Sequence, residues 1–204
     1  MAVTPNYGWP IPVATDLVKD GYAAIADLGD AIDATVFGLG GGGFVQIGTT
    51  QSFTTASTVN VNDVFSAAYK NYKIVINGVA SNNSALLMRM RVGGADNTSS
   101  NYRYQRFLSS SEPSSQNSGS TNTTSFTIAS LQTQLRGVVQ IDMFNPFETT
   151  NTTYTGNGFG LDSTSLVYLI GGNLSVTTSY TGFSIIPASG TITGNVSIFG
   201  IEVN

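Results

Sequence analysis

The chain of 204 residues contains neither cysteine nor histidine. Without cysteine there is no disulfide framework and no thiolate metal site. Without histidine as well, Ser-His-Asp and Cys-His catalysis is excluded, and so are imidazole metal ligands. General acid and base chemistry would fall to carboxylates, which show no recognised catalytic spacing in residues 44–204. We therefore expect a protein that is not an enzyme, with no catalytic residues, no metal site and no cofactor.

Charge is also scarce, because charged residues make up only 10% of the chain. Before Phe44 there are five acids and one base, and after it seven acids and seven bases. This nearly neutral second part offers no basic patch for nucleic-acid phosphates. No apolar run approaches the roughly 20 residues that span a bilayer, and residues 1–10 lack the charged and apolar regions of a signal peptide. The sequence predicts neither nucleic-acid binding nor membrane insertion.

A glycine-rich spacer, Gly38–Gly43, divides the chain into two regions of different composition. Residues 1–43 are predicted to form an extended attachment arm, an amphipathic helix and this spacer. Residues 44–204 are long enough for a domain with its own core. The spacer fits the pattern G-x-G-x-x-G, but a dinucleotide fingerprint needs a strand before the glycines and a helix after them. Here the order is reversed, so we interpret the spacer as a linker.

The segment Thr15–Val36 is predicted to be a helix. Thr15 and Asp16 offer N-cap chemistry and Gly38 offers a stop. One alternative is that its apolar stripe packs on the chain's own β-domain. A helix of barely three heptads is marginal alone in water, however, and branched residues at successive core positions suit close packing of three copies. We favour a homotrimer, with trimerisation residues Val18, Ile25, Leu28 and Ile32.

The arm before this helix is rich in proline. Proline excludes regular helix and restricts its neighbours to extended backbone. Large amphipathic aromatic side chains dominate interface energetics. The predicted attachment residues are Tyr7, Trp9, Pro10 and Pro12, with a disordered leader as the alternative.

After the spacer the hydrophobic period changes to two, which is typical of half-buried strands. The pattern predicts strands over Tyr72–Val79, Leu86–Val92, Arg136–Phe144, Leu174–Ile186 and Ile192–Val203. Gly182 and Gly200 are predicted to lie at β-bulges. Many short strands indicate a mainly β protein, with the helix followed by an antiparallel, jelly-roll-like β-sandwich.

Turn signals separate these strands, at Val92–Asn97, Asn145–Pro146, Gly171–Asn173 and Pro187–Gly190. The segment Ser109–Ser125 has no apolar side chain to bury and is predicted to be a long exposed loop. The run Gly93–Thr98 carries oxygen ligands and could hold Ca²⁺, but it lacks the spaced carboxylates of a known calcium loop. A plain hairpin turn is the favoured interpretation.

The run around Tyr102 interleaves aromatic and cationic side chains. One interpretation is a glycan-binding or partner-binding surface made by Tyr102, Arg103, Tyr104 and Arg106. The alternative, which we favour, is a strand whose aromatic face lies in the core.

The opening of the chain resembles the start of many tailed-bacteriophage structural proteins. The resemblance lies in residues 4–12, TPNYGWPIP, and in Asp16, Val18–Gly21, Ala23–Ile25 and Leu28–Asp33. More weakly, Phe183–Pro187, Gly190–Gly194 and Ile198–Gly200 are similar to the last hairpin of phage-encoded β-sandwiches. Such an opening implies attachment to the virion and trimerisation, with a variable β-domain behind it.

The resemblance implies a virion structural protein, assembled in the host cytoplasm and located on the tail or capsid surface. A short trimeric tail fibre or tail-associated protein used for host attachment is the first interpretation. Its partners would be other virion proteins and host cell-surface polysaccharide. A capsid decoration or cement protein is nearly as well supported, and a carbohydrate-binding module is a more distant alternative.

Overall fold

We describe a computed structural model over residues 2–11, 13, 18–38, 43–110, 115–133, 136–161 and 165–201. The chain separates into two compact units, Met1–Gly42 and Gly43–Asn204. The first unit contains β1 (Ala2–Val3), β2 (Pro10–Ile11), a 3-10 turn (Val18–Asp20) and α1 (Gly21–Gly38).

The second unit consists of strands. Their bounds are β3 (Phe44–Gln46), β4 (Gln51–Ala56), β5 (Val59–Val61), β6 (Asn71–Ala80), β7 (Ser84–Val92), β8 (Ala95–Asp96), β9 (Tyr102–Ser110), β10 (Ser115–Thr123), β11 (Phe126–Leu131), β12 (Gly137–Phe144), β13 (Thr152–Leu161), β14 (Ser165–Leu174), β15 (Gly182–Pro187) and β16 (Ile192–Ile201).

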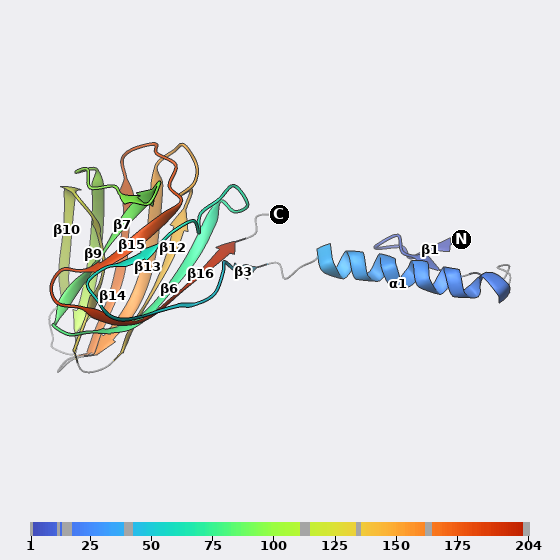
Figure 1. Cartoon of the computed structure of the whole chain (residues 1–204), viewed down its shortest axis with the longest axis horizontal. Coiled ribbons are helices and arrows are strands. Elements are labelled where there is room, and N and C mark those ends of the chain that lie inside the picture. The colour runs from blue at the N-terminus through green and yellow to red at the C-terminus, as the bar shows by residue number, and fades with distance from the viewer. Residues whose placement is uncertain are drawn as a thin grey trace. The chain divides into compact units, whose positions relative to one another are not determined.

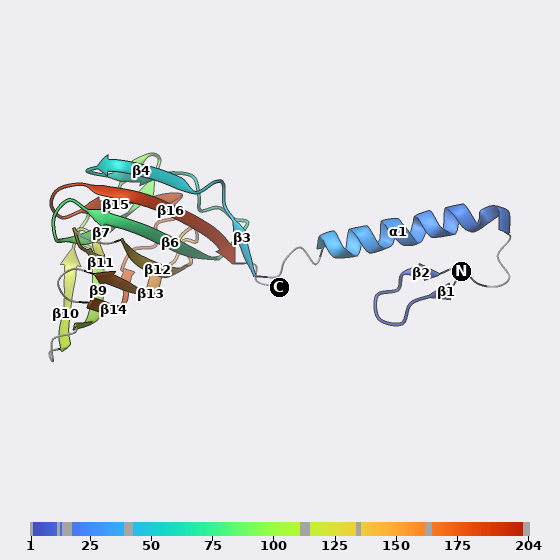
Figure 2. The same cartoon turned by 90° about the horizontal axis from the view of Figure 1, so that it is seen from below.

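Two antiparallel sheets form the layers of a sandwich-like domain (Figures 1 and 2). Among the described residues, nine strands make the larger sheet in the order β10-β9-β14-β13-β12-β6-β16-β3, with β4 also pairing with β16. The smaller sheet has the order β11-β7-β15-β5, and β8 pairs with β7. The mainly β, antiparallel sandwich predicted from the sequence is confirmed. The finer jelly-roll assignment stays a prediction.

One hydrophobic core contains side chains from both sheets. In β6, alternate residues are buried from Tyr72 to Ala80, as the period-2 pattern predicts. Strands β12 and β16 alternate in the same way, and β7 and β15 bury Met88 and Phe183 from the other layer. Burying one such apolar side chain is worth about 1.5–3 kcal/mol. The inner faces of the two sheets therefore hold the domain together.

Two expected loop regions are strands. The segment Ser109–Ser125, predicted to be an exposed loop, contains β10, which pairs with β9 at the edge of the large sheet. The turn expected at Gly171–Asn173 lies inside β14. Leu174 ends that strand, so the strand predicted over Leu174–Ile186 is wrong in its first half. Turns do occur at Gly93–Gly94, at Asn145–Pro146 and after Pro187.

The predicted bulge at Gly200 is wrong, because the ladder of β6 and β16 keeps its register there. Gly182 is the first residue of β15 and begins its ladder with β7, so the bulge predicted there stays a prediction. The two glycines allow close approach. A Cβ on Gly182 would lie 2.2 Å from the Val61 carbonyl oxygen, and one on Gly200 would lie 2.4 Å from the Tyr69 ring. Glycine in a strand has either meaning, and spacing alone does not separate them.

The helix is shorter than predicted. The α-helical segment begins at Gly21, and Val18–Asp20 form a 3-10 turn before it. It ends at Gly38, the residue expected to stop it. The proposed N-cap residues, Thr15 and Asp16, lie outside the described residues, as do most of the spacer's residues, 39–42.

Candidate functional site

The N-terminal arm is a small hairpin that packs on α1. Strands β1 and β2 pair antiparallel, and the backbone N–H of Thr4 donates to the Trp9 carbonyl at 2.8 Å. The Trp9 indole Nε1 donates to the hydroxyl of Thr35 on α1, also at 2.8 Å. Figures 1 and 2 show the hairpin lying along the helix. The proline-rich segment is thus a folded element that covers part of the helix.

The predicted attachment residues have different exposures. Trp9 and Pro10 are half-buried, whereas Tyr7 is 59% exposed. The Tyr7 ring stacks on Trp9 with centroids 5.1 Å apart and an interplanar angle of 19°. Pro12 lies outside the described residues. Within this set, Tyr7 has the large aromatic surface open to a partner, and Trp9 fixes it to the helix.

The hairpin side of α1 carries Ala24, Leu28, Ala31 and Thr35, which recur at spacings of four and three and so share one face. Ala24 is buried, and Thr35 accepts the indole hydrogen bond. Leu28, predicted to be a trimerisation residue, belongs to this face and is half-buried. The hairpin therefore uses part of the apolar surface that the sequence assigned to trimerisation.

A second apolar stripe of α1 is largely exposed, with only Ile32 half-buried among its members. We call the residues Tyr22, Ile25, Gly29, Ile32 and Val36 the helix stripe; they follow the same spacing of three and four residues. Tyr22 is 84% exposed, Ile25 65% and Val36 60%. Val18, in the preceding 3-10 turn, is 98% exposed. Two predicted trimerisation residues in α1, Ile25 and Ile32, lie on this stripe.

Gly29 is the one glycine of the helix stripe, and no contact among the described residues requires a glycine at this position. Glycine inside a helix costs about 1 kcal/mol relative to alanine. A Cβ at Gly29 would meet nothing within 4 Å, so no intrachain contact requires the missing side chain. Close approach of another backbone would require it. Sequence reasoning missed Tyr22, Gly29 and Val36, although their spacing of four residues from Val18, Ile25 and Ile32 could have found them.

The strand β9 turns its two tyrosines toward the core, as the favoured alternative predicted. Tyr102 is fully buried, and its hydroxyl accepts from the Met90 N–H at 3.0 Å and donates to the Asn97 carbonyl at 2.8 Å. Burial raises the pKa of Tyr102 above its ordinary value. Tyr104 is half-buried against the core. The interpretation of Tyr102 as part of a glycan-binding surface is therefore wrong, whereas that of Tyr104 stays a prediction.

The two arginines of the same strand also differ. Arg106 donates to Ser118 Oγ at 2.5 Å and to Ser130 Oγ at 3.2 Å. Its guanidinium thus links β9 to β10 and β11. Arg103 is exposed, and is the one residue of the predicted group that lies fully on the surface.

The run predicted to be either a hairpin turn or a calcium loop is a two-residue turn between β7 and β8. Gly93 and Gly94 have φ angles of 58° and 78°, which glycine adopts without strain. Asp96 forms an ion pair with Arg91 and accepts a hydrogen bond from Ser184 Oγ at 2.7 Å. The described residues contain no group of three or more acidic side chains that could hold a metal ion.

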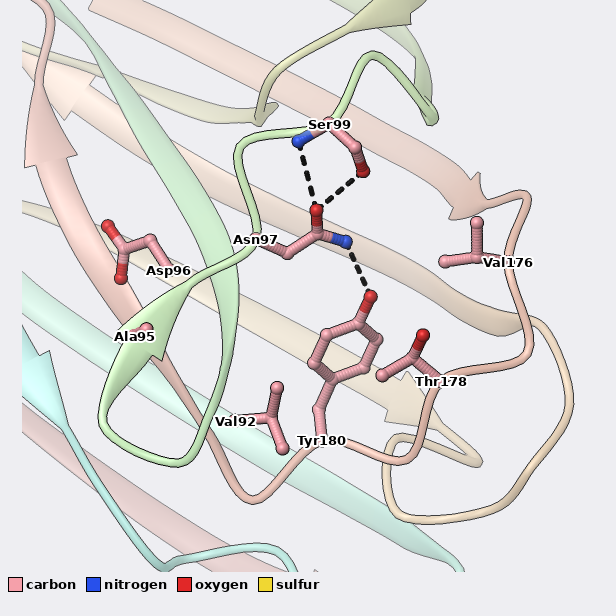
Figure 3. A pocket seen from close by; sticks show the side chains of 8 residues that line it. All are labelled: Val92, Ala95, Asp96, Asn97, Ser99, Val176, Thr178 and Tyr180. Carbon is pink, nitrogen blue, oxygen red and sulfur yellow. Dashed lines mark hydrogen bonds between the residues drawn. The ribbon is translucent and has the colours of Figure 1, made fainter.

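A pocket of about 270 Å³ lies beside this turn, where the β14–β15 connection approaches it (Figure 3). Asn97 crosses it, accepting from the Ser99 N–H at 2.9 Å and donating to the Tyr180 hydroxyl at 2.5 Å. Val92, Ala95 and Val176 give much of the remaining lining. Ligand sites usually have volumes of about 300–1,000 Å³. This smaller pocket, whose amide is already bonded within the chain, is explained by the loop packing.

No helix among the described residues has the length and apolar character needed to cross a membrane. Comparisons with protein-family models, with curated proteins and with solved structures found no match. The hairpin, the helix stripe and the surface of the β-domain must therefore be interpreted from their own geometry.

Proposed function

We propose that this chain is a non-enzymatic bacteriophage virion structural protein. It is a short trimeric fibre or tail-associated protein, anchored by its N-terminal unit, that displays the β-domain toward the host surface. The opening residues supply the resemblance to tailed-phage structural proteins, and the largely exposed helix stripe is the observation that carries the proposal.

The helix stripe supports self-association. An 18-residue helix is marginal in water unless an apolar face packs on something. The hairpin covers one face, and exposed Tyr22, Ile25 and Val36 remain on the next. Gly29 lies at the middle of this row and leaves room for a neighbouring helix. Three copies related by a threefold axis would bury the helix stripe and leave the acidic residues Asp27 and Asp30 facing solvent.

The hairpin supports attachment. Its turn presents the Tyr7 ring, and Trp9 holds that turn against α1 through Thr35. A pre-formed element loses less conformational entropy on docking than a free chain does. We assign Tyr7 as the direct contact with another virion protein, with Trp9 and Pro10 supporting its position.

The mass of the full-length chain in solution tests the trimer. Light scattering after size exclusion should give three times the chain mass of 21.4 kDa. Ile25→Asn should reduce the mass to that of a monomer, because it places an amide on the helix stripe. Ala34→Asn, on the exposed acidic side of α1, is the matched control and should leave the trimer intact. A monomeric parent chain would contradict the proposal.

Particle incorporation tests attachment separately. Tyr7→Ser should give soluble trimers that no longer join particles when supplied to a phage that lacks the chain. Asn6→Ser, one residue away in the same exposed turn, is the control. Normal incorporation of Tyr7→Ser would remove Tyr7 from the attachment surface while leaving the trimer proposal standing.

A capsid decoration or cement protein is the second candidate, because a trimer with an attachment element also suits a capsid threefold axis. Gold-labelled antibody on intact particles distinguishes the two, since it scores label on heads against label on tails. A monomer that binds polysaccharide would instead favour the carbohydrate-binding module.

A further inference from the structure

The outer face of the large sheet carries an apolar patch. We call Phe107, Phe159, Val167 and Leu169 the outer patch; their side chains are 43%, 40%, 51% and 57% exposed. They come from neighbouring strands β9, β14 and β13. Leu169 pairs with Phe107, and Val167 pairs with Phe159. The four residues are therefore contiguous on one surface.

The same face is mixed beyond the outer patch, because Phe159 pairs in turn with the half-buried Val138. Following the row of Phe107 and Leu169 across the sheet, the next partners are Asn157 and Gln140. The partner of Phe107 on the other side is Asn117. A sheet with one solvated face normally alternates apolar-in and polar-out. Contiguous exposed apolar residues are typical of interaction sites.

A hollow of about 410 Å³ adjoins the outer patch, lined by Gln105, Arg106, Phe107, Asn117, Leu169 and Ile170. In the next row Gln105 pairs with Gly171, which has no side chain to fill the surface. A cavity of about 150 Å³ can hold a benzene ring. The hollow is thus large enough for an aromatic or aliphatic side chain from a partner, and it lies beside protruding side chains of those types.

We propose that the outer patch packs against the β-domain of another copy of this chain. The face offers a protrusion, Val167 and Leu169, and a hollow beside Gln105, as a head-to-tail contact in a closed ring requires. Neither paired row of the outer patch contains a charged residue from β10 to β16. These two rows therefore bring no like charges together, and the adjoining row carries the paired charges of Lys73 and Asp142.

The size of the outer patch fits a tethered contact. Four half-exposed residues make a patch on the order of a few hundred Å², below the roughly 1,000 Å² expected for a stable free interface. A short linker raises the effective concentration of two attached domains to about the millimolar range. The inference rests on the proposed trimer, because helix assembly would supply that concentration through the segment 38–43.

Interspin distances between β-domains test this contact. The chain has no cysteine, so Thr54→Cys, at an exposed position of β4, takes one spin label per copy. In the full-length parent, pulsed electron paramagnetic resonance should give one narrow distance. Adding Val167→Ser with Leu169→Ser should abolish that narrow distance while the trimer mass stays unchanged. Adding Val92→Ser, which is 42% exposed in the smaller sheet, should preserve it.

The outcomes separate the inference from the proposed function. A monomeric parent contradicts the trimer and, with it, this contact. A trimeric parent with a broad distribution, or a narrow distance that survives loss of Val167 and Leu169, overturns the contact alone. Loss of host-cell adsorption with an unchanged narrow distance would also overturn it, and would assign the outer patch to the cell surface.

Discussion

The indole of Trp9 and the hydroxyl of Thr35 form a two-step hydrogen-bonded link between the arm and α1. Trp9 Nε1 donates to Thr35 Oγ1 at 2.8 Å, and that hydroxyl donates to the Ala31 carbonyl, also at 2.8 Å. Thr35 therefore satisfies a helix carbonyl and holds the arm at once. The link explains why a segment with three prolines in its first twelve residues nevertheless has a definite place on the helix.

Thr35→Val should loosen the hairpin without unfolding the helix. The substitution keeps the side-chain shape but leaves the half-buried indole N–H unpaired, which costs about 1–3 kcal/mol. Trp9 is the chain's single tryptophan, so tryptophan fluorescence reports on the surroundings of this one indole. We expect a red-shifted emission maximum and faster exchange of the Thr4 amide.

The control for Thr35→Val is Thr4→Val, which makes the same chemical change within the hairpin. It removes the Oγ1 acceptor of the Trp9 backbone N–H but leaves the indole bond to Thr35 in place. Its emission maximum should therefore shift less than that of Thr35→Val. An unshifted maximum in Thr35→Val would show that this hydrogen bond does not hold the arm on the helix.

Gly29 should matter for the association of copies and not for the folding of the chain. Gly29→Ala should raise the stability of the isolated helix by up to about 1 kcal/mol, and Gly29→Leu should separate the copies because a large side chain would fill the space for the neighbouring helix. Sedimentation at several concentrations measures the association constant, and circular dichroism measures helix content. Ala34→Leu, on the acidic side of α1, is the size-matched control. Unchanged association with Gly29→Leu would mean that other helices do not approach here.

Strand positions with an alternating apolar pattern were predictable, and those without one were not. Tyr72, Ile74 and Ile76 fall on one face of a period-2 pattern, and β6 buries these three residues. Strand β10 consists of Ser, Gln, Asn, Gly and Thr, so it has no apolar alternation. It forms because β9 supplies a neighbouring edge for backbone hydrogen bonds, which is a tertiary effect that local sequence does not contain.

The glycines show the same limit. Gly171 and Gly172 resemble a turn in the sequence, yet both lie in β14. A Cβ at Gly172 would lie 2.1 Å from the Arg103 carbonyl oxygen, so this residue is small because of a strand that lies far earlier in the chain.

In the candidate site, the apolar periodicity of α1 could be predicted from the sequence. Its division between the hairpin and the helix stripe depends on how β2 packs, which periodicity does not specify.

Arg91 should be one of the most sensitive polar positions in the β-domain. It is only 8% exposed and bonds to Asn60, Asn62, Asp96 and the Gly94 carbonyl. Removing one member of a buried ion pair typically costs about 3–5 kcal/mol. Arg91→Met should therefore lower the urea midpoint strongly, as followed by the β-sheet signal in circular dichroism.

The control for Arg91 is the more exposed ion pair between Lys73 and Asp142. Their atoms are 2.7 Å apart, and the side chains are 22% and 38% exposed. Surface pairs contribute about 0–1 kcal/mol, so Lys73→Met should have a small effect. If Arg91→Met and Lys73→Met lowered the urea midpoint equally, burial of the Arg91–Asp96 ion pair would not determine how much that pair stabilises the domain.

Buried tyrosines should lower the free energy of unfolding of the β-domain in alkali. Burial raises the pKa of Tyr102, Tyr154 and Tyr168 above the ordinary value of 10.0. Below about pH 10 both folded and unfolded chains keep these protons, so the free energy of unfolding is unaffected. Above it the unfolded chain releases protons that the folded chain retains, and each such tyrosine lowers the free energy of unfolding by up to about 1.4 kcal/mol per pH unit.

Urea midpoints measured from about pH 8 to about pH 11 should therefore stay level and then fall. Tyr154→Phe should make the fall shallower, because its hydroxyl has only a long 3.3 Å bond to the Thr127 carbonyl and the phenylalanine ring fills the same space. A slope that is identical in Tyr154→Phe and the parent chain would exclude Tyr154 as a source of the alkaline loss.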